Sequence, residues 1–208
     1  MSLTEKRKIE LEELADSTRQ RLTVYDVFPV PMRTVWQRIH DVEITPRIST
    51  RIERDEQMLL DQAFTVVDTT KREIVLSSTT EKDIGITSRA NFTLAHELGH
   101  ALLHTSDKIL SRSKSHRDYR SKAGVLNVKW KENEANYFAA AFLMPLKAIA
   151  PQQNKEEISQ IFKVSIKTAE IRLEELEKQR MPKLERRLSE NTLRSMERLG
   201  IDTSKYRK

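Results

Sequence analysis

The chain has 208 residues, of which 38% are apolar and 33% are charged, and its formal net charge is +6. This composition indicates a soluble globular protein with a sizeable core, and it contains no apolar run long enough to span a membrane. Cysteine is absent, which excludes disulfides and leaves histidines and carboxylates as metal ligands. Because residues 1–13 are polar and lack the apolar core of a secretory signal, we expect a cytoplasmic protein.

The positive charge is concentrated near the end of the chain. Residues 180–208 hold nine basic and four acidic side chains, whereas residues 1–23 hold five of each. A basic tail can contact nucleic acid or an acidic partner, but charged runs usually form the solvated face of a helix. We therefore expect a solvated helix there and no direct nucleic-acid binding, although the basic tail leaves that alternative open.

The first half of the chain predicts helices followed by a sheet. Apolar residues at helical spacing predict helices at 3–21 and at 31–40. Segments rich in β-branched residues, separated by short turns, then predict strands at 57–60, 63–68 and 73–77. These strands should form a small, mostly antiparallel sheet.

The second half of the chain predicts mainly helices. They are expected at 88–104, 131–144, 155–162, 166–180 and 183–199, with a long loop at 105–129 that includes a short strand at 125–128. The fold class is therefore α+β, and we divide the chain into an N-terminal helix (1–23), a domain with a small sheet packed on helices (24–150) and a helical C-terminal region with a basic tail (151–208).

The run His96-Glu97-Leu98-Gly99-His100 carries the clearest chemical signal. On a helix its two histidines lie one turn apart, and they share a face with Glu97 opposite the apolar residues. Neutral imidazoles that converge in this way suit Zn²⁺, whose catalytic sites keep one position for water. Glu97 lies beside that position and can act as the general base of a metallopeptidase. Manganese or iron is less suited to this donor set than zinc.

A third protein ligand is needed, and the sequence offers several candidates. His104 lies about 12 Å along the helix from His96, so it cannot share an ion with both histidines and is expected to have an outer or structural role. Glu132 lies on a helix face with Asn136, which could hydrogen-bond a ligating histidine. We therefore predict Glu132 as the ligand, with Glu134, on the opposite face and expected to be solvated or salt-bridged, as the fallback.

An oxyanion-stabilising donor is also required for peptide hydrolysis. Tyr119, His116 and Tyr137 are candidates, the first two because the predicted long loop could cover a cleft. Each of them is equally compatible with an ordinary surface or core position.

Two stretches resemble signatures of the ImmA/IrrE family of metallopeptidases. Residues 92–104 (FTLAHELGHALLH) resemble FTLAHELGHxLLH, and residues 132–145 (ENEANYFAAAFLMP) resemble ExEANxFAAxLLMP, with Phe142 where leucine is usual. The resemblance implies a zincin-like, specifically gluzincin-like, peptidase fold in which zinc is held by His96, His100 and Glu132, with Glu97 as the base. It also implies cleavage of a helix-turn-helix repressor that controls stress or mobile-element genes.

Two further hypotheses concern partners. Residues 155–180 have a helix-turn-helix cadence, but the second helix carries four glutamates, so we expect it to pack on the core and not to read DNA. Residues 73–77 could act as an edge strand that holds an extended substrate. The alternative to a peptidase is a non-catalytic module of the same fold that sequesters a repressor or antitoxin, which would have no need of Glu97.

Overall fold

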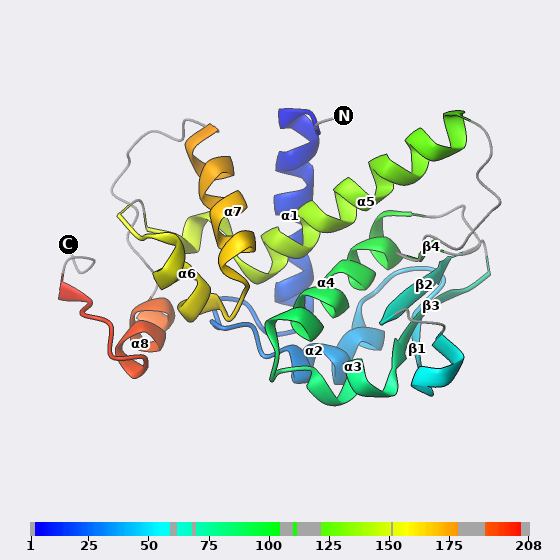
Figure 1. Cartoon of the computed structure of the whole chain (residues 1–208), viewed down its shortest axis with the longest axis horizontal. Coiled ribbons are helices and arrows are strands. Elements are labelled where there is room, and N and C mark those ends of the chain that lie inside the picture. Colours follow the sequence, from blue (N-terminus) through cyan, green and yellow to red (C-terminus); the bar gives the residue numbers. More distant parts are fainter. Residues whose placement is uncertain are drawn as a thin grey trace.

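The structure is a computed structural model that describes residues 3–58, 62–67, 70–104, 110–111, 122–150, 152–178 and 190–204. Most of these residues are helical. The sheet lies at one end of the molecule and the C-terminal helices lie at the other (Figure 1). The α-helices are α1 (Glu5–Arg21), α2 (Met32–Arg38), α3 (Ser78–Asp83), α4 (Ser88–Leu103), α5 (Lys122–Leu143), α6 (Lys155–Phe162), α7 (Ile166–Lys178) and α8 (Glu190–Arg198).

The sheet has four strands in the order β1-β3-β2-β4. Strand β3 pairs in parallel with β1 and antiparallel with β2, and β2 pairs antiparallel with β4. The expected α+β class with a small, mostly antiparallel sheet is therefore confirmed, with one parallel pair added. The strands are β1 (Ile48–Glu53), β2 (Ala63–Val67), β3 (Arg72–Ser77) and β4 (Leu110–Ser111).

Helix α4 is the central element, because it packs on β2 and β3 on one side and on α5 on another. It begins where the Thr87 side chain accepts a hydrogen bond from the backbone N–H of Ala90, which satisfies one of the free N–H groups of the first turn. It ends where the guanidinium of Arg72, on β3, donates to the carbonyls of Ala101 and His104. A partly buried cap at the first turn and buried hydrogen bonds from β3 at the last turn hold the helix in place.

Helix α5 lies between α4 and α1, and its C-terminal end is held by two buried arginines. Arg19 of α1 donates to the carbonyls of Ala141 and Phe142, each at 2.8 Å. Arg172 of α7 donates to the carbonyl of Met144 at 2.9 Å. Cations suit the negative end of a helix, so these two side chains join α1 and α7 to the end of α5.

The C-terminal helices pack on the body of the protein. Ile158, Ile161 and Phe162 of α6 and Ala169 of α7 are fully or almost fully buried in the same core as α4 and α5. The Phe162 ring meets the ring of Phe28 edge-on, with centroids 5.2 Å apart. Helix α8 adds further apolar contacts on α6. The described part of the C-terminal region is therefore joined to the core, as the helix-turn-helix segment was expected to be.

Several predicted elements need correction. The segment 57–60 is not a strand where it is described, because a short 3-10 helix spans Asp55–Met58. The strand expected at 125–128 is part of α5, which begins at Lys122 and so extends into the predicted loop. Segment 73–77 is not an edge strand, because β3 lies between β1 and β2 and has no free edge for a peptide. The helix predicted at 183–199 is described only from Glu190, where α8 begins.

Among the described residues, none of the helices combines the length and the apolarity that crossing a membrane demands.

Candidate metal centre

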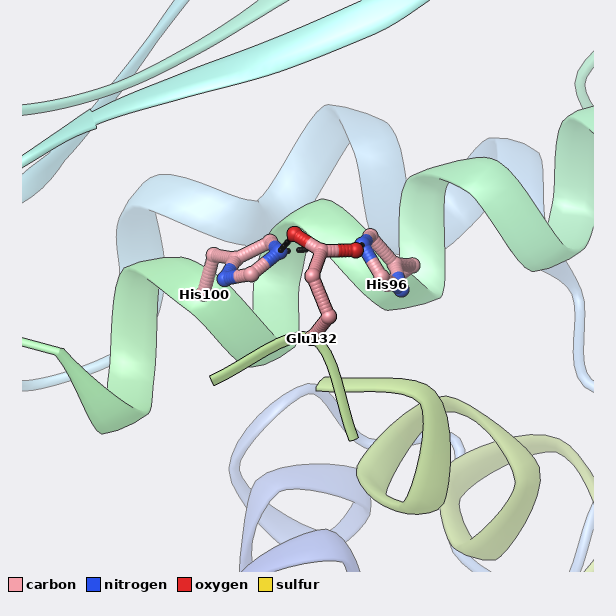
Figure 2. A group of neighbouring side chains, drawn as sticks. All are labelled: His96, His100 and Glu132. Atoms are coloured by element: carbon pink, nitrogen blue, oxygen red, sulfur yellow. Dashed lines mark hydrogen bonds and ion pairs between the residues drawn. The ribbon is translucent and has the colours of Figure 1, made fainter. Parts of the chain in front are cut away.

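Three side chains converge where α4 and α5 face each other. His96 and His100 come from α4 and Glu132 comes from α5, and Figure 2 shows the carboxylate reaching both imidazoles. The Nε2 atoms of the two histidines are 2.9 Å apart, and the Glu132 oxygens lie 3.4 Å from His96 Nε2 and 3.1 Å from His100 Nε2. The two histidines are buried and Glu132 is partly buried. The three residues that the sequence grouped are thus brought together.

This set of donors fits a tetrahedral metal ion. When ligand atoms lie about 2.0–2.1 Å from zinc in a tetrahedral arrangement, neighbouring ligands are separated by roughly 3.3 Å. The observed separations between the three residues bracket that value. Two imidazole nitrogens and one carboxylate also form the protein ligand set of catalytic zinc sites that keep a fourth position for water.

The ring of His96 is oriented by Asn136, one turn after Glu132 on α5. Its Nδ1–H donates to Asn136 Oδ1 at 3.0 Å, which leaves the lone pair on Nε2 for a metal. The predicted hydrogen bond from Asn136 to a ligating histidine is therefore present in the structure. The phenyl ring of Phe92, one turn before His96 on α4, lies 6.5 Å from the imidazole between ring centroids.

Glu132 is ionised at neutral pH in this environment. Burial by itself raises the pKa of its carboxyl, but the hydrogen bonds and charges of His100 and His96 outweigh that effect and lower the pKa well below its usual range. A permanent negative charge is therefore held against the two imidazole nitrogens, as a divalent cation requires.

Glu97 lies on α4 beside His96, but it is not one of the three side chains that converge. Its carboxylate accepts a hydrogen bond from the Thr65 hydroxyl of β2, with Oγ1 to Oε2 at 2.7 Å, and the same hydroxyl lies 3.1 Å from the Glu97 carbonyl oxygen. Both side chains are almost completely buried. The sheet therefore fixes the direction of the carboxylate that the sequence identifies as the base.

His104 and Glu134 form a separate pair beside the centre. Glu134 is buried and forms an ion pair with Arg7 of α1, and its other oxygen lies 3.8 Å from His104 Nδ1. Burial, together with the nearby charges of His100 and Lys131, lowers the pKa of His104 to about 3, so its imidazole is neutral. Neither residue joins the three ligand atoms, and Glu134 is salt-bridged, as expected, but buried.

The candidates for the oxyanion role are only partly visible. His116 and Tyr119 lie outside the described residues. Tyr137 points toward α1, where its hydroxyl donates to Glu12 at 3.1 Å, and burial raises its pKa. The Tyr137 hydroxyl is therefore engaged on the α1 side of α5.

The distance between α4 and α5 depends on Gly99, between the two histidines. A Cβ at this position would lie 3.0 Å from Phe138 Cδ1 and 3.3 Å from Ala135 Cα. The absent side chain lets the helices approach closely enough for Glu132 to reach the α4 histidines.

Comparison with protein families places this geometry in a known group. The family model described as Peptidase_M78, the IrrE N-terminal-like domain, matches residues 60–174, which is more than half of the chain. The chain belongs to the Peptidase_M78 family. The fold is accordingly zincin-like, and the domain is of the metallopeptidase type. A comparison with curated proteins gave no match for this Peptidase_M78 chain.

Two residues that position the side chains of this site in the Peptidase_M78 chain, Thr65 and Arg72, could not be identified from the sequence. Thr65 contacts Glu97 across 32 positions of chain, and Arg72 caps the helix that carries the histidines. Thr65 belongs to a predicted strand and Arg72 to a predicted turn, and neither position marks a functional side chain. Only the alternation along 63–67, which places Thr65 on the same face as the apolar Ala63 and Val67, indicated that this hydroxyl would be buried.

Proposed function

We propose that the protein is a zinc-dependent endopeptidase that cleaves a DNA-binding repressor of the helix-turn-helix class. The observation that supports this most strongly is the coexistence of a complete ligand set with a buried, sheet-oriented Glu97. A module that only held a partner would need the fold and the ion but no general base. Membership of the Peptidase_M78 family supports the peptidase part of the proposal, and the repressor is the substrate that the sequence resemblance implies.

His96, His100 and Glu132 would hold the ion. When bound, zinc supplies a Lewis acid that brings the pKa of a water molecule near to about 7. Asn136 keeps the His96 ring in the tautomer that presents Nε2. Thr65 engages Oε2 of Glu97, so Oε1 is the oxygen that takes a proton from water and later delivers it to the leaving amine.

The test uses the purified 208-residue chain and, as substrate, a helix-turn-helix repressor from the same organism, chosen first from the reading frames beside its gene. Cleavage is expected with zinc and is expected to stop when a chelator is added. The Glu97→Gln variant should bind zinc as the wild type does, because Glu97 is not among the three ligands, yet it should cleave about 100- to 10,000-fold more slowly. If Glu97→Gln relieves repression in cells as well as the wild type, hydrolysis is not the mechanism and the protein acts by sequestration.

A further inference from the structure

A cavity of about 770 Å³ lies beside the metal centre, between α1, α4, α5 and α7. This volume falls within the range of roughly 300–1,000 Å³ that is usual for sites that bind ligands. Its walls are mostly apolar and include Leu3, which precedes α1, Phe92 of α4, Ala140 of α5 and Ile171 of α7. Helix α1 lies before the segment that the Peptidase_M78 family model matches, so part of this cavity is built by residues outside that segment.

The cavity touches the metal centre through two residues. Asn136 and Phe92 line it, and these are the residues that contact the ring of His96, by a hydrogen bond and by a ring contact respectively. The cavity wall therefore begins on the Nδ1 side of His96, one imidazole ring away from the Nε2 atom that faces Glu132. Because an extended peptide advances about 3.3 Å per residue, a substrate residue one or two positions from the scissile bond lies at a distance from which its side chain could reach this wall.

The charged groups of the cavity are already paired. Lys8 Nζ lies 2.7 Å from a carboxylate oxygen of Glu5 and 2.7 Å from one of Glu175. The Arg172 guanidinium is bound to Glu12 at 2.6 Å and to the Met144 carbonyl. A charged ligand would compete with these pairs, with Nη1 of Arg172 as the one buried donor of the four side chains that has no partner among the described residues, whereas an apolar side chain gains contact with the walls without disturbing them.

Ile171 completes the apolar wall at the solvent side. It is 53% exposed on α7, although it is a large aliphatic residue that lines the cavity. Single exposed aliphatic residues are common on protein surfaces, and Ile166 on the same helix is 51% exposed, so Ile171 matters here because it lines the cavity.

From these observations we infer that the cavity is a specificity pocket, which takes a large aliphatic or aromatic side chain of the protein substrate within two residues of the scissile bond. The inference rests on the proposed peptidase function and extends it to substrate recognition. It assigns to α1 and α7 a role in selecting the cleavage site.

The test is a cleavage-site profile of the zinc-loaded full-length protein on a peptide library prepared from a digested proteome. The wild type should enrich large apolar residues at one position near the cut. Ala140→Phe fills the pocket and should reduce cleavage of those peptides about tenfold, while peptides with a small residue there change less than twofold. Ile171→Glu places a charge in the wall and should reduce the same enrichment.

The matched control is Ile166→Glu. Ile166 is 51% exposed on the same helix but does not line the cavity, so this variant should keep the wild-type profile. Melting temperatures of all three variants show whether the fold survives, and Ile171→Glu, at an exposed position, serves where Ala140→Phe does not fold.

The pocket and the proposed function can fail separately. A profile without apolar preference, or pocket variants whose profile matches that of Ile166→Glu, overturns the pocket and leaves peptidase activity intact. A library that is not cut at all also overturns it, since side-chain recognition near the cut should act on unfolded peptides. The peptidase function itself is judged by cleavage of the repressor.

Discussion

Helix α5 takes part in two buried polar clusters, and the two differ in how their charges are neutralised. At its C-terminal end, Arg19 and Arg172 direct their donors at helix carbonyls, and Arg172 also binds a carboxylate. Near its middle, the Glu132 oxygens and the Nε2 atoms of the two α4 histidines converge on one point. In the first cluster each guanidinium already has a carboxylate partner, Asp16 for Arg19 and Glu12 for Arg172, whereas the second cluster has the donor atoms that a cation would need. A buried polar cluster that is neutralised by side chains of the protein stabilises the fold. A cluster that needs an added cation is a candidate binding site.

The largest expected effect concerns the balanced cluster. Arg172→Met should lower the free energy of unfolding of the metal-free protein by about 3–5 kcal/mol, because it leaves the Glu12 carboxylate and the Met144 carbonyl without their buried donor. Urea denaturation measures this loss. Arg38→Met, at an exposed pair with Asp41, should cost about 1 kcal/mol or less. Equal losses in the two variants would remove the distinction between the clusters.

The next effect tests the cluster that needs a cation. Glu132→Ala should weaken zinc binding by more than the roughly 10- to 100-fold that loss of an outer partner costs, measured by competition with a fluorescent chelator. Glu134→Ala, two residues along, should leave the affinity within a few-fold and reduce stability, because its carboxylate binds Arg7. If Glu134→Ala abolishes zinc binding instead, the third ligand has been misassigned.

A pH titration sharpens the comparison at His104, a buried polar group that belongs to neither cluster. Its pKa is about 3 in the folded protein, against about 6.5 in an unfolded chain. The folded state therefore binds fewer protons, and stability is lost as the pH falls below about 6.5 toward 3. Between pH 6.5 and 5 the metal-free protein should lose about 2 kcal/mol. His104→Gln should flatten this slope, and an unchanged slope would contradict the assignment.

The smallest effect concerns the orientation of the base. Thr65→Val keeps the shape of the side chain but removes the hydrogen bond to Glu97, and it should lower kcat at least about tenfold while KM and zinc affinity stay the same. Thr65→Ser should restore most of the rate. Steady-state kinetics on the repressor decides the outcome, and a valine variant with wild-type kcat would show that the hydroxyl only fastens β2 to α4.

Much of the centre could be predicted because it depends on local spacing. His96 and His100 are one turn apart on a helix with a clear apolar face, and Glu132 and Asn136 repeat that spacing on the next helix. In both cases the period of the helix places the side chains together. That these two faces meet was predicted from the need for a third metal ligand and from the resemblance of both segments to signatures of one family.

What could not be predicted depends on contacts between distant segments. Strand β1 was missed because most of its residues are exposed and show no apolar alternation. The first turns of α5 were taken for a loop and strand because Gly124, Val125 and Val128 have low helix propensity. The central place of β3 follows from strand order, because each of its residues pairs with a β1 residue 24 positions earlier in the chain. The buried arginines were indistinguishable in sequence from solvated ones.

Gly99 has a consequence for how the centre could be altered. Its missing side chain sets how near α4 comes to Ala135 and Phe138 of α5. The distance between Glu132 and the two α4 histidines therefore depends on the spacing of the two helix backbones. Gly99→Ala would widen that spacing by a few tenths of an ångström without changing a single donor atom. The separation of the three candidate donor groups is thus set partly by a residue that offers no donor atom itself.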